Sequence, residues 1–146
     1  MNTVRCKKLD PRATLPAYGT AWAAGADLYA LCEAPVVIAP GQTVLVHTGI
    51  ALEIPVGFVG LIYARSGLAT KRGLAPANKV GVIDADYRGE IMVALYNQSG
   101  VPQTVESGER IAQLVIAPFL QATFEESEQL SDTVRGEGGF GSTGSK

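Results

Sequence analysis

Residues that bind metals or form disulfides are scarce in this sequence. Among its 146 residues are two cysteines, Cys6 and Cys32, and one histidine, His47. The cysteines form no CxxC pair, which argues against a zinc ribbon and against a thioredoxin motif. One histidine without clustered cysteines also argues against a dedicated zinc site. We expect two reduced thiols, with a single disulfide as the alternative, and assign none of the three residues a role.

Long apolar runs and an excess of positive charge are also absent. No run approaches the ~20 apolar residues that a membrane-spanning helix needs, and the first twenty residues contain no apolar core of a signal peptide. The net charge is −2, which argues against general affinity for nucleic acid or anionic membranes but permits a local site for a small anion. We therefore expect a cytoplasmic protein.

Short runs rich in valine, isoleucine and leucine make up most of the chain, a pattern typical of strands. Turn residues such as Pro40-Gly41 and Ser107-Gly108 separate these runs. One all-β domain, a sandwich or barrel, is predicted. A short helix over 66–73 should end at Gly73. The predicted strands are 35–39, 43–54, 57–64, 79–84, 90–97 and 110–119.

The last twelve residues, RGEGGFGSTGSK, include five glycines. Gly139, Gly141 and Gly144 match GxGxxG, but a dinucleotide site needs a helix after this motif, and only two residues follow. Ordering twelve residues costs on the order of 12–24 kcal/mol, whereas burying one phenylalanine returns about 1.5–3 kcal/mol. We predict a body of residues 1–122, an acidic linker of 123–134 and a glycine-rich tail of 135–146 that is disordered without ligand.

Two stretches place polar residues where a predicted strand ends. In YARSGLA (63–69), Arg65, Ser66 and Gly67 would form an anion cradle, and a solvated arginine beside an N-cap serine fits equally well. In GVIDADYRGE (81–90), we predict a β-hairpin with Asp84 near its mouth, although aspartate and glycine are ordinary turn residues. Tyr87 is unusual there because an aromatic residue stands at the turn.

Two single polar residues lie among apolar neighbours. Asp27 in AGADLYA (24–30) is either a satisfied structural group or a carboxylate that faces a hydrated metal ion. Gln113 interrupts the apolar strand within SGERIAQLVIAPF (107–119), and an outward-facing polar side chain is the simplest interpretation.

Five ordered stretches together resemble the trimeric dUTPases, the deoxyuridine triphosphate nucleotidohydrolases: AGADLYA, ARSGLA, GVIDADYRGE, GERIAQLVI and RGEGGFGSTG. They span residues 24–144. The resemblance implies an all-β jelly-roll (β-clip-like) subunit with one short helix and a flexible C-terminal tail, in a homotrimer whose active sites are each built from three chains. The implied reaction converts dUTP to dUMP and pyrophosphate with Mg²⁺, which keeps uracil out of DNA and supplies dUMP for dTMP synthesis.

The same resemblance implies a role for each matching residue. Asp84 would be the general base that activates water for attack on the α-phosphorus. Tyr87 would pack against the deoxyribose and leave no room for a 2′-hydroxyl. An amide can donate and accept, which suits uracil's edge, whereas cytosine would leave polar groups unpaired. The implied residues for uracil and sugar are Asn78, Gly81, Ile83, Tyr87, Met92 and Phe140.

The phosphates and the metal ion would be held at separate positions. Asp27 would bind waters on Mg²⁺, an ion that keeps several waters and commonly binds through substrate phosphates. The tail would close as a lid, with Phe140 over uracil and water excluded from the phosphates. The implied phosphate-binding residues are Arg65, Ser66, Gly67, Gln113, Arg135, Gly141 and Ser142.

Two other functions are compatible with this fold. The dCTP deaminases share the fold and the cradle, but they resemble Arg-Ser-Ser where this chain has Arg65-Ser66-Gly67. A non-catalytic jelly-roll that binds dUTP or a protein partner is a rival of another class, and the presence of Asp84 and the tail argues against it. Release of ammonia from dCTP would identify the first, and dUTP binding without pyrophosphate release would identify the second.

Overall fold

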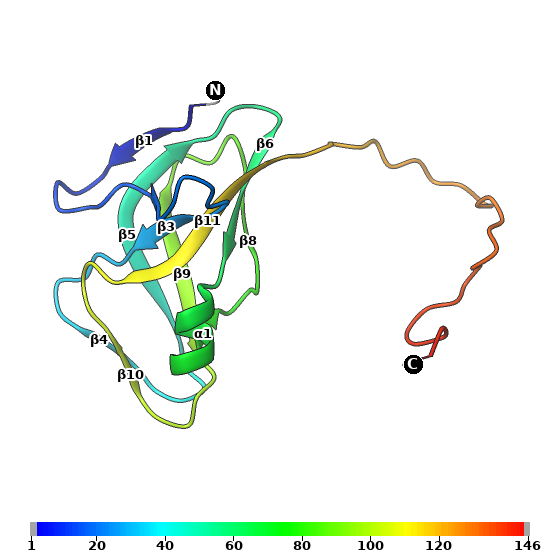
Figure 1. The fold of residues 1–146 in the computed structure, drawn as a ribbon. Helices are drawn as coiled ribbons and strands as arrows, with labels where there is room; N and C mark the ends of the chain where they lie inside the picture. The colour runs from blue at the N-terminus through cyan, green and yellow to red at the C-terminus, as the bar shows by residue number, and fades with distance from the viewer. Residues whose placement is uncertain (1–2, 145–146) are drawn as a thin grey trace.

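A computed structural model describes residues 3–144, and these residues form strands and one short helix (Figure 1). One antiparallel sheet has the order β1 (Arg5–Lys8), β5 (Thr43–Glu53), β9 (Glu90–Asn97), β7 (Leu74–Pro76). A second has the order β2 (Ala17–Tyr18), β3 (Ala26–Tyr29), β11 (Arg110–Pro118), β6 (Phe58–Tyr63), β8 (Gly81–Ile83). A ribbon pairs β10 (Gln103–Val105) with β4 (Val36–Ile38), and α1 spans Ser66–Arg72.

The six predicted strands are present with slightly different ends, and five further strands of two to four residues were not predicted. Such short strands carry too little alternation to be recognised from the sequence. The helix ends as predicted, because Gly73 takes the left-handed φ of 65° that glycine tolerates best. The alternative of Ser66 as N-cap was wrong: Arg65 holds that position, and no side chain caps the helix.

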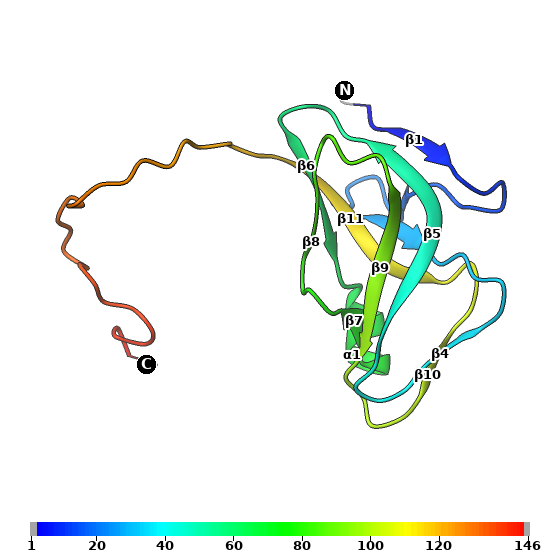
Figure 2. The ribbon, with the colours of Figure 1, turned by 180° about the vertical axis from the view of Figure 1, so that it is seen from behind.

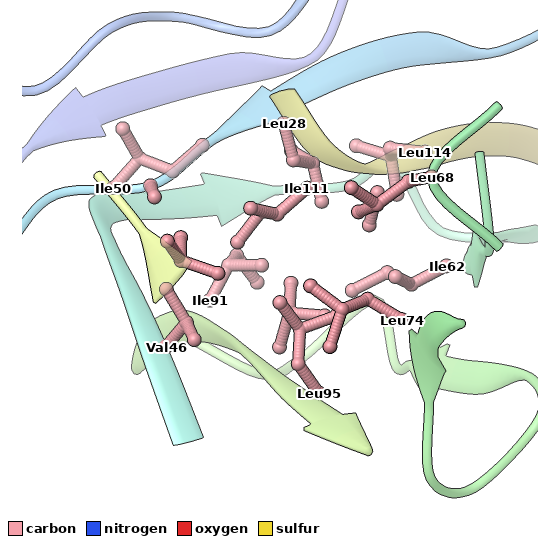
Figure 3. Close-up of a cluster of buried hydrophobic side chains, with 14 of the residues drawn as sticks. Leu28, Val46, Ile50, Ile62, Leu68, Leu74, Ile91, Leu95, Ile111 and Leu114 are labelled. Atoms are coloured by element: carbon pink, nitrogen blue, oxygen red, sulfur yellow. The ribbon is translucent and has the colours of Figure 1, made fainter. Parts of the chain in front are cut away.

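Apolar side chains of both sheets and of α1 form one core (Figure 3). Leu28 and Ile111 come from the five-stranded sheet, Ile91 and Leu95 come from the four-stranded sheet, and all are almost completely buried. Tight packing of this kind resists displacement of the strands. The core therefore provides fixed edges on which polar groups can be placed accurately.

The segment predicted as a β-hairpin differs in the structure. β8 pairs with β6, whereas β9 pairs with β5 and β7, so the two strands belong to different sheets. Residues 84–89 cross from one sheet to the other. Short apolar runs between turn residues predicted both strands, but such runs do not specify which strands pair.

The C-terminal segment leaves the body after β11 and extends away from it (Figures 1 and 2). Its apolar side chains are exposed, including Phe124 at 96% and Phe140 at 115%. The predicted division at 122/123 and 134/135 stays a prediction, and residues 145–146 of the tail lie outside the described residues. Both cysteines are free thiols. None of the helices in residues 3–144 is long and apolar enough to cross a membrane.

Candidate active site

A groove lies between β8 and the start of β9, and we call it the β8–β9 groove. One part, of about 250 Å³, is lined by Ile83, Asp84, Tyr87 and Met92 among others. The adjoining part, of about 180 Å³, shares Ile83 and Met92 and adds Asn78 and Gly81. The structure thus brings together every residue of the body that was predicted to bind uracil or sugar, together with the predicted base.

The groove exists because the facing strand edges are not paired with each other. β8 is the last strand of its sheet, and β7 pairs with β9 only at Leu95–Asn97. Across the described chain, residues 91–93 of β9 therefore have no strand partner on the side that faces β8. Unpaired backbone N–H and C=O groups need hydrogen-bond partners. The edge of a flat heterocycle can provide them.

Local backbone geometry places Asn78 at one end of the groove. Lys79 takes a φ of 67°, and the Val80 N–H donates to the Asn78 carbonyl at 2.7 Å, so a tight turn places Asn78 beside Gly81. A Cβ at Gly81 would lie 3.1 Å from Cβ of Ile62, which explains the need for glycine.

The other end of the groove contains Asp84 and Tyr87. The Tyr87 N–H donates to the Asp84 carbonyl at 3.1 Å, and the Tyr87 hydroxyl donates to the Glu90 carbonyl at 2.8 Å. The ring lies over Gly89, where a Cβ would be 2.5 Å from the hydroxyl. An aromatic ring at this turn is therefore held by backbone contacts on both sides.

A second cluster contains Asp27, Arg65 and Gln113, and strand register explains it. β11 lies between β3 and β6, so Gln113 pairs with both Asp27 and Tyr63. Arg65 Nε donates to Asp27 Oδ1 at 2.8 Å, and Gln113 Nε2 donates to the Ala64 carbonyl at 2.8 Å. Gln113 is therefore half-buried and bonded to the backbone of the neighbouring segment, and is not a simple solvent-facing polar residue.

Asp27 orients the guanidinium of this cluster. Its side chain is 13% exposed, and Arg110 Nη1 lies 3.6 Å from its other oxygen. In the part of the chain that the structure describes, Nε is the only side-chain nitrogen of Arg65 with a hydrogen-bond partner. Both Nη groups remain available for an anion, and guanidinium groups match phosphate geometry well. Ser66 and Gly67 follow directly at the start of α1.

The two clusters lie far apart on one chain. Ile83 pairs with Gly60 near one end of β6, whereas Arg65 follows the other end of that strand. At ~3.3 Å per residue, five or six residues separate Asp84 from Arg65 by roughly 15–20 Å. The groove and the cluster around Arg65 are therefore separate places on one chain.

The predicted tail residues form a third group, remote from both clusters (Figure 1). Arg135 Nε donates to the Gly138 carbonyl at 2.7 Å, and turns link Gly139 to Ser142 and Gly141 to Gly144. Phe140 and Gly141 take φ values of 50° and 89°. The structure therefore does not bring the tail to the groove or to the cradle of the same chain.

Asp27 was predicted to contact a metal ion through water. Within residues 3–144, no three His, Cys, Asp or Glu side chains converge on a possible ion site. Asp27 accepts from Arg65, and its oxygens retain lone pairs for water. This donor set fits a divalent cation that is bound chiefly by substrate phosphates and reaches Asp27 through water.

Sequence reasoning missed three residues beside these clusters. Arg110 pairs with Asp27, and His47 pairs with Glu90 next to Tyr87. Their positions depend on strand register and on two β-bulges, at Arg110/Ala112 and at His47/Ala51. The charged residue types were visible in the sequence, but no pattern there indicated their partners.

Known proteins similar to this chain were found by sequence and by structure. The dUTPase family model matches residues 11–144. The deoxyuridine 5'-triphosphate nucleotidohydrolase of Acinetobacter baumannii is 50% identical over 146 residues, covering 97% of each chain. The enzyme of the same name from Desulfitobacterium hafniense is 50% identical over 149 residues, covering 99% of each chain.

Solved structures agree with these sequence matches. The dUTPase of Staphylococcus bacteriophage 80alpha with dUpNHpp has a TM-score of 0.86 and 31% identity, over 99% of each chain. A mutant of that phage enzyme has a TM-score of 0.88, 30% identity, and coverage of 97% of this chain and 98% of that chain. The predicted all-β jelly-roll with one short helix is confirmed, because dUTPases share that fold. With the family model over most of its length and relatives at 50% identity, this chain belongs to the dUTPase family.

Proposed function

We propose that this chain hydrolyses dUTP to dUMP and pyrophosphate, with Asp84 as general base. The observation that carries the proposal is the β8–β9 groove, which places Asp84 beside a slot lined by unpaired backbone, an amide and an aromatic ring. Asp84 accepts a proton from water as the water oxygen bonds to the α-phosphorus. The bond from that phosphorus to the bridging oxygen breaks, and pyrophosphate leaves. A positioned base of this kind contributes about 10²–10⁴-fold.

Recognition of base and sugar is assigned to the same groove. Asn78 and the backbone of residues 81–92 pair with the edge of uracil, and Gly81, Ile83 and Met92 form the walls. A methyl group at C5 would need space that this narrow slot lacks. Tyr87 packs on the deoxyribose, where its fixed ring leaves no room for a 2′-hydroxyl.

Binding of the triphosphate is assigned to Arg65, Ser66, Gly67 and Gln113. The Nη groups of Arg65 meet phosphate oxygens while Asp27 holds Nε. The cation is proposed to be Mg²⁺, held by the phosphates and, through water, by Asp27. When bound, it neutralises charge on the phosphates.

A complete site requires more than one copy of the chain. Asp84 and Arg65 of one chain lie toward opposite ends of β6, at backbone positions roughly 15–20 Å apart. We therefore assign the groove and the cradle of each site to different subunits of a homotrimer. The tail, which extends from the body, supplies Arg135, Phe140, Gly141 and Ser142 as a lid from the third subunit. The product dUMP would serve dTMP synthesis, and loss of dUTP would keep uracil out of DNA.

The test is pyrophosphate release, with Mg²⁺, from dUTP, dTTP, dCTP and UTP. We expect release from dUTP alone, and a loss of about 10²-fold or more in Asp84→Asn. Asp86→Asn is the matched control because it removes a carboxylate from the same turn. Release from all four nucleotides would refute uracil recognition, and equal effects of the two substitutions would refute Asp84 as the base.

A further inference from the structure

His47 and Glu90 face each other next to the β8–β9 groove. His47 Nδ1 lies 2.5 Å from Glu90 Oε2. The two side chains are 59% and 24% exposed, and a pair with this exposure contributes little to folding stability. What the pair does provide is a fixed position for the side chain of Glu90.

The pair spans an interruption in the sheet. β5 and β9 pair regularly from Thr43–Tyr96 to His47–Met92, and pairing resumes only at Ala51–Glu90. Gly49 takes a φ of 71° within this bulge. A bulge leaves residues without their ladder partners and bends the strand, and bulges often occur beside active sites.

Two consecutive side chains of β5 replace the missing ladder contacts. His47 contacts the carboxylate of Glu90, and the Thr48 hydroxyl donates to the carbonyl of Ile91. Thr48 is buried, whereas His47 lies toward solvent. The first two residues of β9 are thus anchored by side chains on opposite faces of the strand.

Glu90 is also the residue that holds Tyr87. The Tyr87 hydroxyl donates to the Glu90 carbonyl at 2.8 Å, and the ring lies over Gly89. A shift of Glu90 would move this acceptor and release the ring. The anchor on Glu90 therefore determines how firmly Tyr87 is fixed in the groove.

We propose that His47, acting through Glu90, is a positioning residue that fixes Tyr87 and so sets discrimination between dUTP and UTP. This inference rests on the proposed function, in which Tyr87 packs on the sugar. His47 touches neither the reacting phosphorus nor the attacking water in this scheme. Its loss should affect the choice of sugar more than the turnover of dUTP at saturation.

The experiment compares kcat and KM for dUTP and UTP in the full-length protein. In His47→Leu and Glu90→Ala, the ratio of kcat/KM for dUTP over UTP should fall about two- to tenfold, in the lower part of the range for coupled neighbours. His47→Asn keeps an N–H donor close to Nδ1 and should retain most of the ratio. The double variant His47→Leu/Glu90→Ala should be no worse than either single variant.

Glu33→Gln is the matched control. It removes the charge from another exposed pair, between Arg12 and Glu33, neither of which belongs to β9 or to the His47–Glu90 pair, and should leave the ratio unchanged. An unchanged ratio in His47→Leu would overturn the proposal, even if that variant is less stable than the wild type. The same fall of the ratio in Glu33→Gln would also overturn it.

A second measurement does not depend on catalysis. His47 is the only histidine, so its imidazole ¹⁵N resonances identify themselves in an NMR spectrum. Glu90→Ala should shift the Nδ1 resonance, and an unchanged resonance would overturn the proposed pair. If Glu90→Ala shifts the resonance but the wild-type protein releases no pyrophosphate from dUTP, the pair is real and the proposed function is refuted, and with it the role in sugar choice.

Discussion

Gly25 is predicted to be required for the position of Gln113 in the proposed phosphate cradle. A Cβ at residue 25 would lie 2.3 Å from Gln113 Oε1, 3.0 Å from its Cδ and 3.1 Å from its Cβ. In Gly25→Ala the amide must therefore leave the Ala64 carbonyl, to which it donates at 2.8 Å.

Two contributions make up the loss of folding stability in Gly25→Ala. The lost hydrogen bond is worth about 0.5–1.5 kcal/mol, and a displaced side chain off its rotamer costs a similar ~0.5–1.5 kcal/mol. We expect unfolding to require about 1–3 kcal/mol less, which corresponds to a fall of roughly 3–10 °C in Tm. The value of kcat/KM for dUTP should fall as far as it does in Gln113→Ala. Calorimetry and pyrophosphate release measure the two effects.

A double variant tests the reasoning. Gln113→Ala removes the two closest atoms but leaves Cβ at 3.1 Å, so Gly25→Ala should cost much less stability in that background. Gly100→Ala is the control, because a Cβ there meets nothing within 4 Å. Stability losses that simply add in Gly25→Ala/Gln113→Ala would show that the clash with Gln113 is not the cause.

Two further predictions concern the tail and the Asp10 region. Deletion of residues 135–146 should leave Tm nearly unchanged, since Phe140 is fully exposed. It should lower kcat/KM for dUTP at least about fivefold, because stacking on a base is worth ~1–3 kcal/mol. Near-normal turnover would refute the proposed lid. Hydrogen bonds from Arg12 lower the pKa of Asp10 from 3.8 to about 2. A carboxyl group with a lowered folded-state pKa stabilises the fold above its unfolded pKa, and this stability is lost as pH falls from about 4 to 2. Asp10→Asn should therefore reduce the acid-induced fall in Tm over that window, and parallel curves for the two proteins would contradict this.

Much of this structure was readable from local sequence. Runs such as 90–97 are short, rich in valine, isoleucine and leucine and bounded by turn residues, so strand type follows from the local sequence. Gly73 ends its helix because the left-handed conformation suits glycine. Asp84 and Tyr87 were identified because their motif occurs in a fixed order with four others, and Asn78 through the family resemblance. The structure places all three around one groove.

Long-range pairing could not be read in the same way. Nothing in residues 81–97 indicates that β8 joins one sheet and β9 the other, because the sequence of a strand does not name its partner. The contact of Asp27 with Arg65 depends on β11 lying between their strands. The contact of His47 with Glu90 depends on a bulge. Each feature is fixed by tertiary packing and leaves no local signal in the sequence.

The proposed lid is joined to a packed body by an extended segment, and this difference affects how the lid can select its ligand. The groove and the cradle are built on strands around a packed core, whereas residues 119–134 contain no strand or helix and can span up to ~55 Å when extended. Ordering the tail costs more than Phe140 returns by burial, so closure of the proposed lid would also need charge-assisted contacts of Arg135 with phosphates. On the proposed mechanism, dUMP offers the base but lacks the outer phosphates. Closure is then favoured with dUTP and disfavoured once pyrophosphate has left, so the same contacts that exclude water during hydrolysis also allow the product to dissociate.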